Sequence, residues 1–203
     1  LKEQMAKVAI KNHHNAMFNP RAQFHKEITM DDVLGSAMVA SPLQLYDCCP
    51  FTDGAAAVVL ASAETAKRLV KKPIYVAGVG QASAGPLYTQ KDIPRVKARE
   101  LAAKQAYDMA GLSPRDVDLA ELHDCFTVAE ILACEGLGLF EYGTGGYAVE
   151  RGDTIIGGKV AVNPSGGLKA KGHPIGATGA AQVYEVVKQL RGEAGQRQVE
   201  GAK

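Results

Sequence analysis

A histidine and a cysteine stand two positions apart in the tetrapeptide His123-Asp124-Cys125-Phe126, between a predicted strand and a predicted helix. A thiol just before a helix N-terminus lies at the positive end of the helix dipole, which lowers its pKa and favours the thiolate. The nearby imidazole supports the same chemistry. The tetrapeptide therefore predicts nucleophilic or acid–base chemistry at Cys125. The alternative left open is a buried cysteine beside a capping aspartate.

A second histidine, His173, is held between Gly172 and Pro174 in a glycine-rich stretch that begins at residues 163–167 and runs on to residue 179. Glycine permits close approach of backbone or ligand, and proline fixes the chain beyond the histidine. The pattern favours a rigidly aimed general base or oxyanion donor. A structural turn with a solvated histidine, or a loop that cradles a phosphate, remains possible on these residues. The P-loop pattern itself is missing.

The remaining polar motifs indicate architecture rather than chemistry. Residues 48–57 hold Cys48 and Cys49, a turn at Asp53-Gly54 and a run of small residues that favours close packing. Residues 12–15 and 19–20 predict polar loop material between short helical pieces, set apart from the core. We expect three histidines in this polar context to be solvated: His13, His14 and His25.

Composition excludes several classes of protein. The chain has 203 residues, 46% hydrophobic and 22% charged, with a formal charge of +1, which is typical of a globular protein and gives no case for nucleic-acid or membrane binding. Its longest apolar run, residues 55–63, is too short to cross a bilayer. Four cysteines without a Cys-x-x-Cys pair predict free thiols in a reducing intracellular compartment and no metal site. Because the chain opens at Leu1 without methionine, we expect a segment upstream.

Strands and helices alternate along the chain, which predicts an α/β fold with a sheet covered by helices and with the chemistry at strand ends. A capping-box pattern at residues 127–130 opens one of the helices. The predicted strands are residues 55–61, 74–79, 118–122 and 159–162, and the predicted helices are residues 64–70, 96–110, 176–190 and one from residue 127.

Three segments, in their order along the chain, resemble the thiolase family. They are residues 48–57, the tetrapeptide at residues 123–126 and the glycine-rich stretch around His173. The form His123-Asp124-Cys125-Phe126 is similar to that of sterol-carrier-protein-type thiolases and of archaeal and bacterial acetoacetyl-CoA thiolases. The resemblance covers essentially the whole chain and implies a layered α/β thiolase fold with a mixed sheet covered by helices. By this resemblance, residues 1–40 end a loop domain, residues 41–72 end the N-terminal half, and residues 73–203 form the C-terminal half without its final strands.

The resemblance also implies roles for individual residues. His173 resembles the histidine that activates the nucleophilic cysteine and helps hold the thioester oxygen, and His123 resembles the residue that completes that oxyanion site. Cys125 resembles the acid/base for the second substrate. The nucleophile itself belongs to the preceding half, so we expect residues 1–203 alone to be inactive. The residues expected to line the substrate site are Asn163, Ser165, Gly166, Gly167 and Gly172.

The implied activity is that of an acetyl-CoA C-acetyltransferase, which condenses acetyl-CoA or cleaves a 3-oxoacyl-CoA. The alternatives are a sterol or branched-chain acyl-CoA thiolase, a retro-aldolase, and a non-catalytic acyl-CoA-binding scaffold subunit. Coenzyme A thioesters are substrates, and no cofactor is expected. The implied partners are a second copy in a homodimer or homotetramer, other acyl-CoA enzymes, or a small zinc-ribbon/OB-fold protein. We expect a cytoplasmic protein, or a peroxisomal one in a eukaryote.

Overall fold

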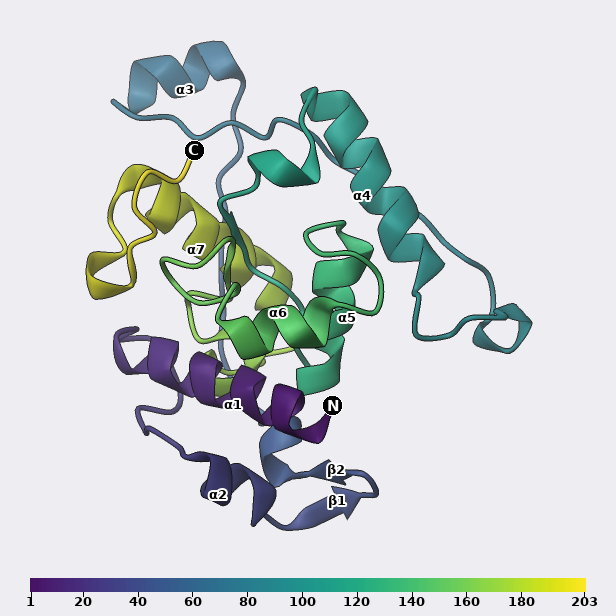
Figure 1. Ribbon diagram of the computed structural model, residues 1–203. Coiled ribbons are helices and arrows are strands. Elements are labelled where there is room, and N and C mark those ends of the chain that lie inside the picture. The colour runs from purple at the N-terminus through teal and green to yellow at the C-terminus, as the bar shows by residue number, and fades with distance from the viewer.

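The computed structural model describes residues 1–203, apart from the side chain of Leu87. Helices dominate the fold (Figure 1). The two sheets have two strands each. β1 and β2 form an antiparallel hairpin, whereas β3 and β4 pair in parallel with Leu119 opposite Ala161. The α-helices are α1 (Lys2–Met17), α2 (Met30–Leu34), α3 (Ala63–Leu69), α4 (Lys97–Ala110), α5 (Thr127–Gly136), α6 (Gly145–Arg151) and α7 (Thr178–Arg191). The strands are β1 (Met38–Ala40), β2 (Leu43–Gln44), β3 (Leu119–Ala120) and β4 (Ala161–Val162).

Helix α1 lies at the centre of the packing, and the expectation of loop material over its C-terminal part is wrong. Met5 and Val8 pack with Ile131 of α5 and Val149 of α6. Another side of α1 packs against the segment around α2, and Ala16 contacts a further cluster near Ala170. A helix that is buried on several sides has no clear amphipathic pattern in its sequence. Its polar residues therefore resemble those of a loop.

The largest apolar cluster lies between the parallel strand pair and α5. Burying this apolar surface is the main stabilising term for the region. Since β3 and β4 run in parallel, the segments that leave their C-terminal ends emerge at one edge of the pair. The buried members of the cluster are Leu122, Ala133, Cys134, Leu139, Phe140, Ala148, Val160 and Val162.

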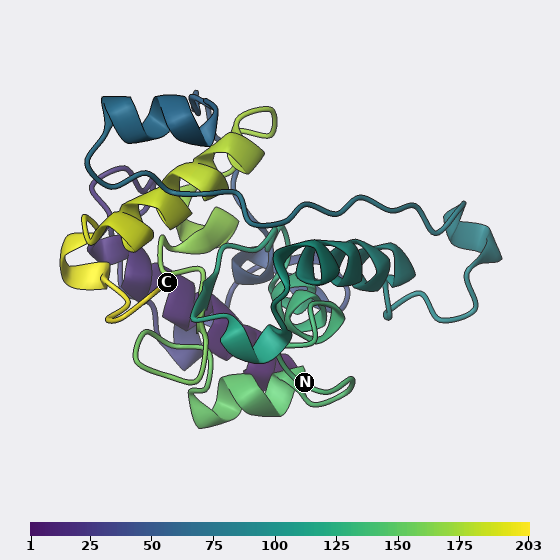
Figure 2. The ribbon, with the colours of Figure 1, turned by 90° about the horizontal axis from the view of Figure 1, so that it is seen from above.

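Two predicted strands are wrong. Residues 55–61 and 74–79 are extended without strand pairing, and none of the described side chains in residues 55–95, which we call the extended segment, is buried. Val59 is 93% exposed. A strand needs a hydrogen-bonding neighbour as well as β-branched residues, and neither run has one among the described residues. Figure 2 shows the segment crossing α7 and then running beside α4. There the backbone at Gly78 and Gly80 lies directly against α4 at Ala106 and Ala102.

The remaining predicted elements are present with shifted ends. The strands expected at 118–122 and 159–162 form β3 and β4, and α4 ends at Gly111, whose left-handed φ of 67° suits glycine. The capping box expected at α5 is wrong. Phe126 is the N-cap residue, and the Thr127 hydroxyl instead donates to Asp47 Oδ1 at 2.9 Å.

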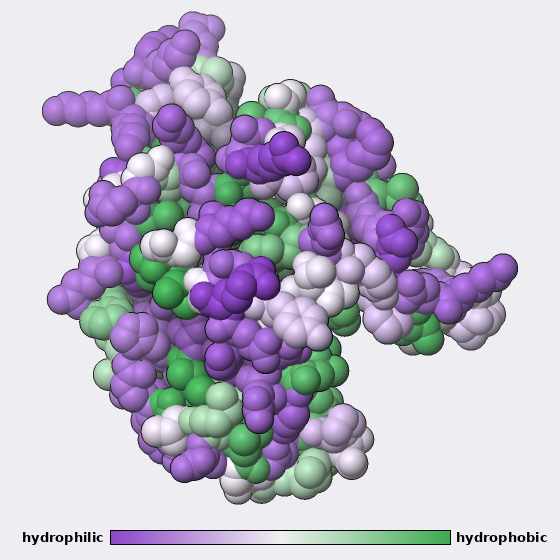
Figure 3. Space-filling view, in the orientation of Figure 1, coloured by the Kyte–Doolittle hydropathy of each residue, from purple (hydrophilic) through white to green (hydrophobic). Residues whose placement is uncertain are grey.

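The surface mixes polar and apolar side chains. On the face of Figure 3, hydrophobic residues form separate patches among polar ones. Within the described part of the chain, none of the helices combines the length and hydrophobicity that a membrane crossing requires.

Candidate active site

The structure brings His123 and His173 together. Their ring centroids lie 5.0 Å apart, with the planes at 87°. His123 follows the end of β3, and His173 follows a π-helix (Gly167–Lys171) that comes after β4. Parallel pairing of the two strands therefore delivers both histidines to the same edge.

Hydrogen bonds fix the imidazole of His173. The Thr178 hydroxyl donates to the Pro174 carbonyl at 3.1 Å, so its lone pair accepts from Nδ1–H of His173 at 2.7 Å. This assignment leaves Nε2 as the basic nitrogen. The backbone N–H of His173 donates to the Thr52 hydroxyl at 3.0 Å, which fixes the loop from the other side. Burial lowers the pKa of His173, and the neighbouring His123 and Lys171 lower it further. The site thus holds a neutral imidazole suited to accept a proton.

Cys125 lies two residues after His123, and its carbonyl accepts a hydrogen bond from the Cys49 N–H at 2.9 Å. The expectation of a lowered thiol pKa is wrong. Burial raises the pKa of Cys125, and the nearby Asp124 raises it further, against the hydrogen bond from the Phe126 backbone. Desolvation of the thiolate therefore outweighs the start of α5. The structure presents Cys125 as a protonated thiol.

A buried group of polar side chains stands behind these residues, and we call its five members the polar frame: Lys11, Asn12, Asp124, Glu130 and Asn163. Glu130 accepts from Lys11 Nζ at 2.6 Å, from Asn12 at 2.8 Å and from Asn163 at 2.7 Å. Asp124 accepts from Asn12 Nδ2 at 2.8 Å. The frame ties α1, α5 and both active-site loops into one unit.

Asp124 also binds the start of the π-helix. It accepts the Leu168 N–H at 2.7 Å and the Lys169 N–H at 3.3 Å, which satisfies orphan donors there. Burial raises the pKa of Asp124 to about 6, and the charge of Glu130 contributes to that rise. In the sequence Asp124 reads as a cap for α5, whereas the structure has it holding the loop that leads to His173.

The predicted substrate-site residues are scaffolding as judged by their contacts, and their binding role stays a prediction. Asn163, at φ 51°, accepts the Leu122 N–H through Oδ1 at 2.7 Å. Ser165 donates from its backbone and its hydroxyl to Glu121, at 2.9 and 2.7 Å. A Cβ on Gly166 would lie 2.8 Å from that of Ala16, and Gly167 and Gly172 are similarly confined, by Asp124 and Thr52.

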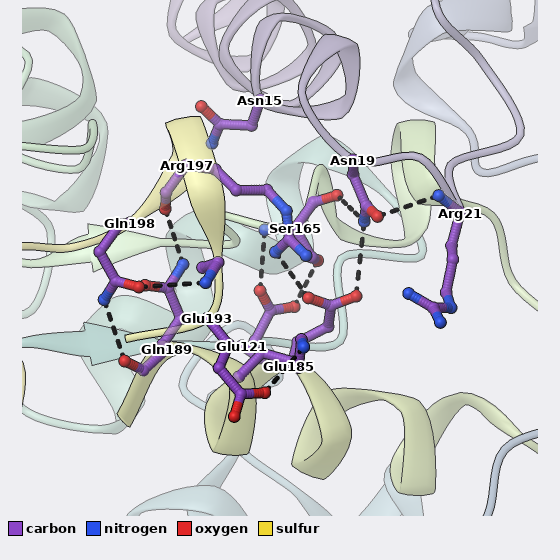
Figure 4. Close-up of polar contacts among 12 residues, drawn as sticks. Asn15, Asn19, Arg21, Glu121, Ser165, Glu185, Gln189, Glu193, Arg197 and Gln198 are labelled. Carbon is purple, nitrogen blue, oxygen red and sulfur yellow. Dashed lines mark hydrogen bonds and ion pairs between the residues drawn. The ribbon is translucent and has the colours of Figure 1, made fainter. Parts of the chain in front are cut away.

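Figure 4 shows a second buried network beneath the same loop, with Glu121 and Ser165 beside Glu185. Arg197 donates to Glu185 at 2.6 Å, and Asn19 donates to the Ser165 carbonyl at 2.8 Å. Burial raises the pKa of Glu121 to about 7, with a further contribution from the charge of Glu185. The loop before His173 therefore rests on a pair of carboxylates on each side, Asp124 with Glu130 and Glu121 with Glu185.

A cavity of about 300 Å³ is lined in part by Cys49, His13 and Lys169, and not by His123, Cys125 or His173. The Lys169 ammonium donates to the Cys48 carbonyl, and burial lowers its pKa to about 8. His13 is only 3% exposed, so the expectation that it is solvated is wrong. Its Nδ1 donates to the Lys26 carbonyl at 3.0 Å.

The other two histidines, His14 and His25, are exposed as expected. Among the described residues no group of three or more His, Cys, Asp or Glu side chains could hold a metal ion.

Two family models match this chain. The family model for the thiolase N-terminal domain matches residues 1–64, and that for the thiolase C-terminal domain-like family matches residues 80–203. Acetyl-CoA acetyltransferase of Methanothermobacter thermautotrophicus is 55% identical over 99% of this chain and 53% of its own. Sterol carrier protein 2 of Oryctolagus cuniculus is 45% identical over 99% of this chain and 38% of its own.

A solved structure, the Ltp2-ChsH2(DUF35) aldolase, superposes with a TM-score of 0.90 at 26% identity. The match covers all of this chain and 53% of that one. The chain therefore spans about half the length of these relatives or less, and the thiolase-like α/β fold predicted from the sequence is confirmed.

Proposed function

Because the chain belongs to the thiolase family, we propose that it supplies the histidine base and the acid/base thiol of an acyl-CoA thiolase. In this proposal an acyl group passes from coenzyme A to a cysteine outside residues 1–203 and then to acetyl-CoA or coenzyme A. The finer assignment is an acetyl-CoA C-acetyltransferase, supported by the 55% identity to the archaeal acetyltransferase. Residues 1–40, 41–72 and 73–203 are proposed as loop-domain end, N-terminal-half end and C-terminal half.

The contact between His173 and His123 carries the proposal. With Nδ1–H donated to Thr178, Nε2 of His173 can take the proton of a nucleophilic thiol and return it to the departing thiolate of coenzyme A. His123 lies edge to face with that ring, where an N–H can stabilise the negative charge that develops on the thioester oxygen. This arrangement suits acyl transfer, which needs a base and an oxyanion donor together.

Cys125 is the proposed acid/base for carbon–carbon bond formation. A protonated thiol can deliver its proton to the enolate that forms when a 3-oxoacyl-CoA is cleaved, and the thiolate can remove that proton in the reverse direction. The raised pKa of Cys125 fits the resting state of this cycle, because the thiol waits in its protonated form.

The test is His173→Asn in the full-length protein, assayed with acetoacetyl-CoA and coenzyme A. Loss of the base predicts a fall in kcat of about 100-fold or more, with little change in thermal stability because the imidazole is only partly buried. His14→Asn, on an exposed ring, is the control. Wild-type turnover in the His173 variant would contradict the proposal.

The aldolase relative supports a second candidate, a retro-aldolase on the same scaffold. Both reactions break a bond next to a carbonyl, so Cys125 could serve either. An assay of acyl-CoA aldol cleavage without added coenzyme A separates them, because only the thiolase requires the free thiol. The name of that aldolase includes a DUF35 protein, which supports a partner protein for this chain as well. Co-purification from the native source tests that partner.

A further inference from the structure

Two cysteines of the site face each other across a short backbone pairing. Cys48 and Phe126 form an antiparallel bridge, and the Cys49 N–H donates to the Cys125 carbonyl at 2.9 Å. In antiparallel pairing, the residue after Cys48 lies opposite the residue before Phe126, so Cys49 lies opposite Cys125, joined to it by this one hydrogen bond. Residues directly opposite each other place their side chains on the same face. The two thiols therefore share one side of the pairing.

The spacing of such a pair suits a disulfide. Residues opposite each other in antiparallel pairing have Cα atoms about 4.5–5.5 Å apart, within the range of about 4.4–6.8 Å that a disulfide spans. Cys48 lies on the other face, since successive side chains alternate, and its thiol donates to the Gln44 carbonyl at 3.5 Å. Cys49 and Cys125 are partly exposed, whereas Cys134 is buried. One pair of the four thiols is thus both aligned and accessible.

We propose that Cys49 and Cys125 form an oxidisable dithiol that a small disulfide such as oxidised glutathione closes. One protein thiolate attacks a sulfur of oxidised glutathione, breaks its S–S bond and releases one glutathione thiol. The second protein thiolate attacks the mixed disulfide, forms the Cys49–Cys125 bond and releases the second glutathione thiol. Two protein thiols are oxidised, one glutathione disulfide is reduced, and the two protein protons end on the two glutathione sulfurs.

The surroundings set the conditions for closure. Burial raises the pKa of both thiols, and the Cys125 thiolate raises that of Cys49 further, against the opposing charge of Lys169. Since the thiolate is the attacking species, the closure rate rises about tenfold per pH unit below the thiol pKa. Closure consumes the thiol that we assign to proton transfer, so its effect on activity rests on the proposed function.

The experiment uses the reduced full-length protein, treated with oxidised glutathione at pH 7 and pH 8, alkylated and digested with trypsin. The dithiol predicts a cross-link between the tryptic peptides 27–67 and 116–151, formed about tenfold faster at pH 8 than at pH 7 and removed by dithiothreitol. Cys48→Ser and Cys134→Ala, in the same two peptides, should retain the cross-link, and Cys49→Ser should abolish it. A cross-link that survives Cys49→Ser, or none in the wild-type protein, overturns the proposal.

Activity after oxidation separates this inference from the proposed function. We expect the cross-linked protein to lose at least 90% of its turnover and to regain it with dithiothreitol. A Cys49–Cys125 cross-link with full turnover would support the dithiol and refute the acid/base role of Cys125. Loss of turnover with Cys125 joined to a cysteine other than Cys49 would refute the dithiol and leave the role of Cys125 standing.

Discussion

The polar frame and the extended segment differ in how the polarity of their residues relates to burial. The frame buries polar side chains, whereas the extended segment exposes apolar ones. The frame places charged side chains such as Lys11 and Glu130 at the centre of the molecule, where each finds two or more partners. The extended segment contains apolar side chains that lie in water: Val59 and Leu60 are 93% and 78% exposed. Apolar character is therefore a poor guide to where this chain holds its structure. The number of partners that a residue finds is a better guide.

The difference follows from the free energy of burying or exposing each kind of side chain. A buried charge is tolerated only where hydrogen bonds and an opposite charge surround it, so losing one member exposes the others to a large penalty. An exposed valine contributes little to stability, since no apolar surface is removed from water. Substitutions in the frame should consequently cost several kcal/mol, and those in the extended segment almost nothing.

The largest effect is expected from Lys11→Met. The substitution leaves the Glu130 carboxylate buried without its cation and leaves the Val162 carbonyl without a donor. Breaking a buried pair in this way costs about 3–5 kcal/mol of unfolding free energy. Urea unfolding followed by circular dichroism measures the loss. Lys104→Met, which breaks an exposed pair with Asp108, should cost less than about 1 kcal/mol. Equal losses for the two variants would refute the special role of the frame.

A smaller loss is expected from Gly166→Ala. The new Cβ would lie 2.8 Å from the Ala16 Cβ at a backbone φ of +101°, so α1 and the loop must separate. We expect a loss of about 2–4 kcal/mol in urea unfolding, together with a reduced kcat of the full-length protein because His173 lies beyond this loop. Gly143→Ala is the matched control, since φ is +83° there but nothing lies within 4 Å of the new Cβ. An equally large loss of stability in Gly143→Ala would show that backbone strain alone, and not the contact with Ala16, causes the effect.

The short motifs of the candidate site can be predicted from the sequence, whereas the contacts between residues far apart in the chain cannot. His123, Cys125 and His173 stand in short motifs whose glycine and helix-start neighbours already indicate chemistry. The hydrogen bond from Lys11 to Glu130 joins residues 119 positions apart, and no periodicity in the sequence of α1 indicates it. Residues 55–61 have strand-forming side chains, but pairing depends on a neighbour that composition cannot supply. The π-helix likewise follows no repeat in the sequence, and its Leu168 N–H binds Asp124, 44 positions earlier.

An intermediate change in unfolding free energy is expected when a rise in pH ionises Glu121. Its folded pKa is about 7, above its ordinary unfolded value, so the folded state holds an extra proton across the window between them. The contribution to stability is present below that window and is lost as pH rises toward 7. Glu121→Gln keeps an uncharged group beside Ser165, so it should match the wild type at pH 4.5 and be more stable at pH 8. Glu64→Gln, on exposed α3, should show no such difference, and urea unfolding at both pH values decides.

The smallest effect is expected from Val59→Ser in the extended segment. The side chain is 93% exposed, so the polar substitution removes almost no buried apolar surface. The unfolding free energy of residues 1–203 should change by less than about 0.5 kcal/mol in urea. Val8→Ser, fully buried in α1, is the contrasting change and should cost several times more, since it opens a cavity and buries a hydroxyl. A loss above about 1.5 kcal/mol at Val59 would show that the segment is packed in solution. If that loss occurs only in a longer protein containing this chain, the partner strand lies outside residues 1–203, and the contrast with the polar frame holds for this chain alone.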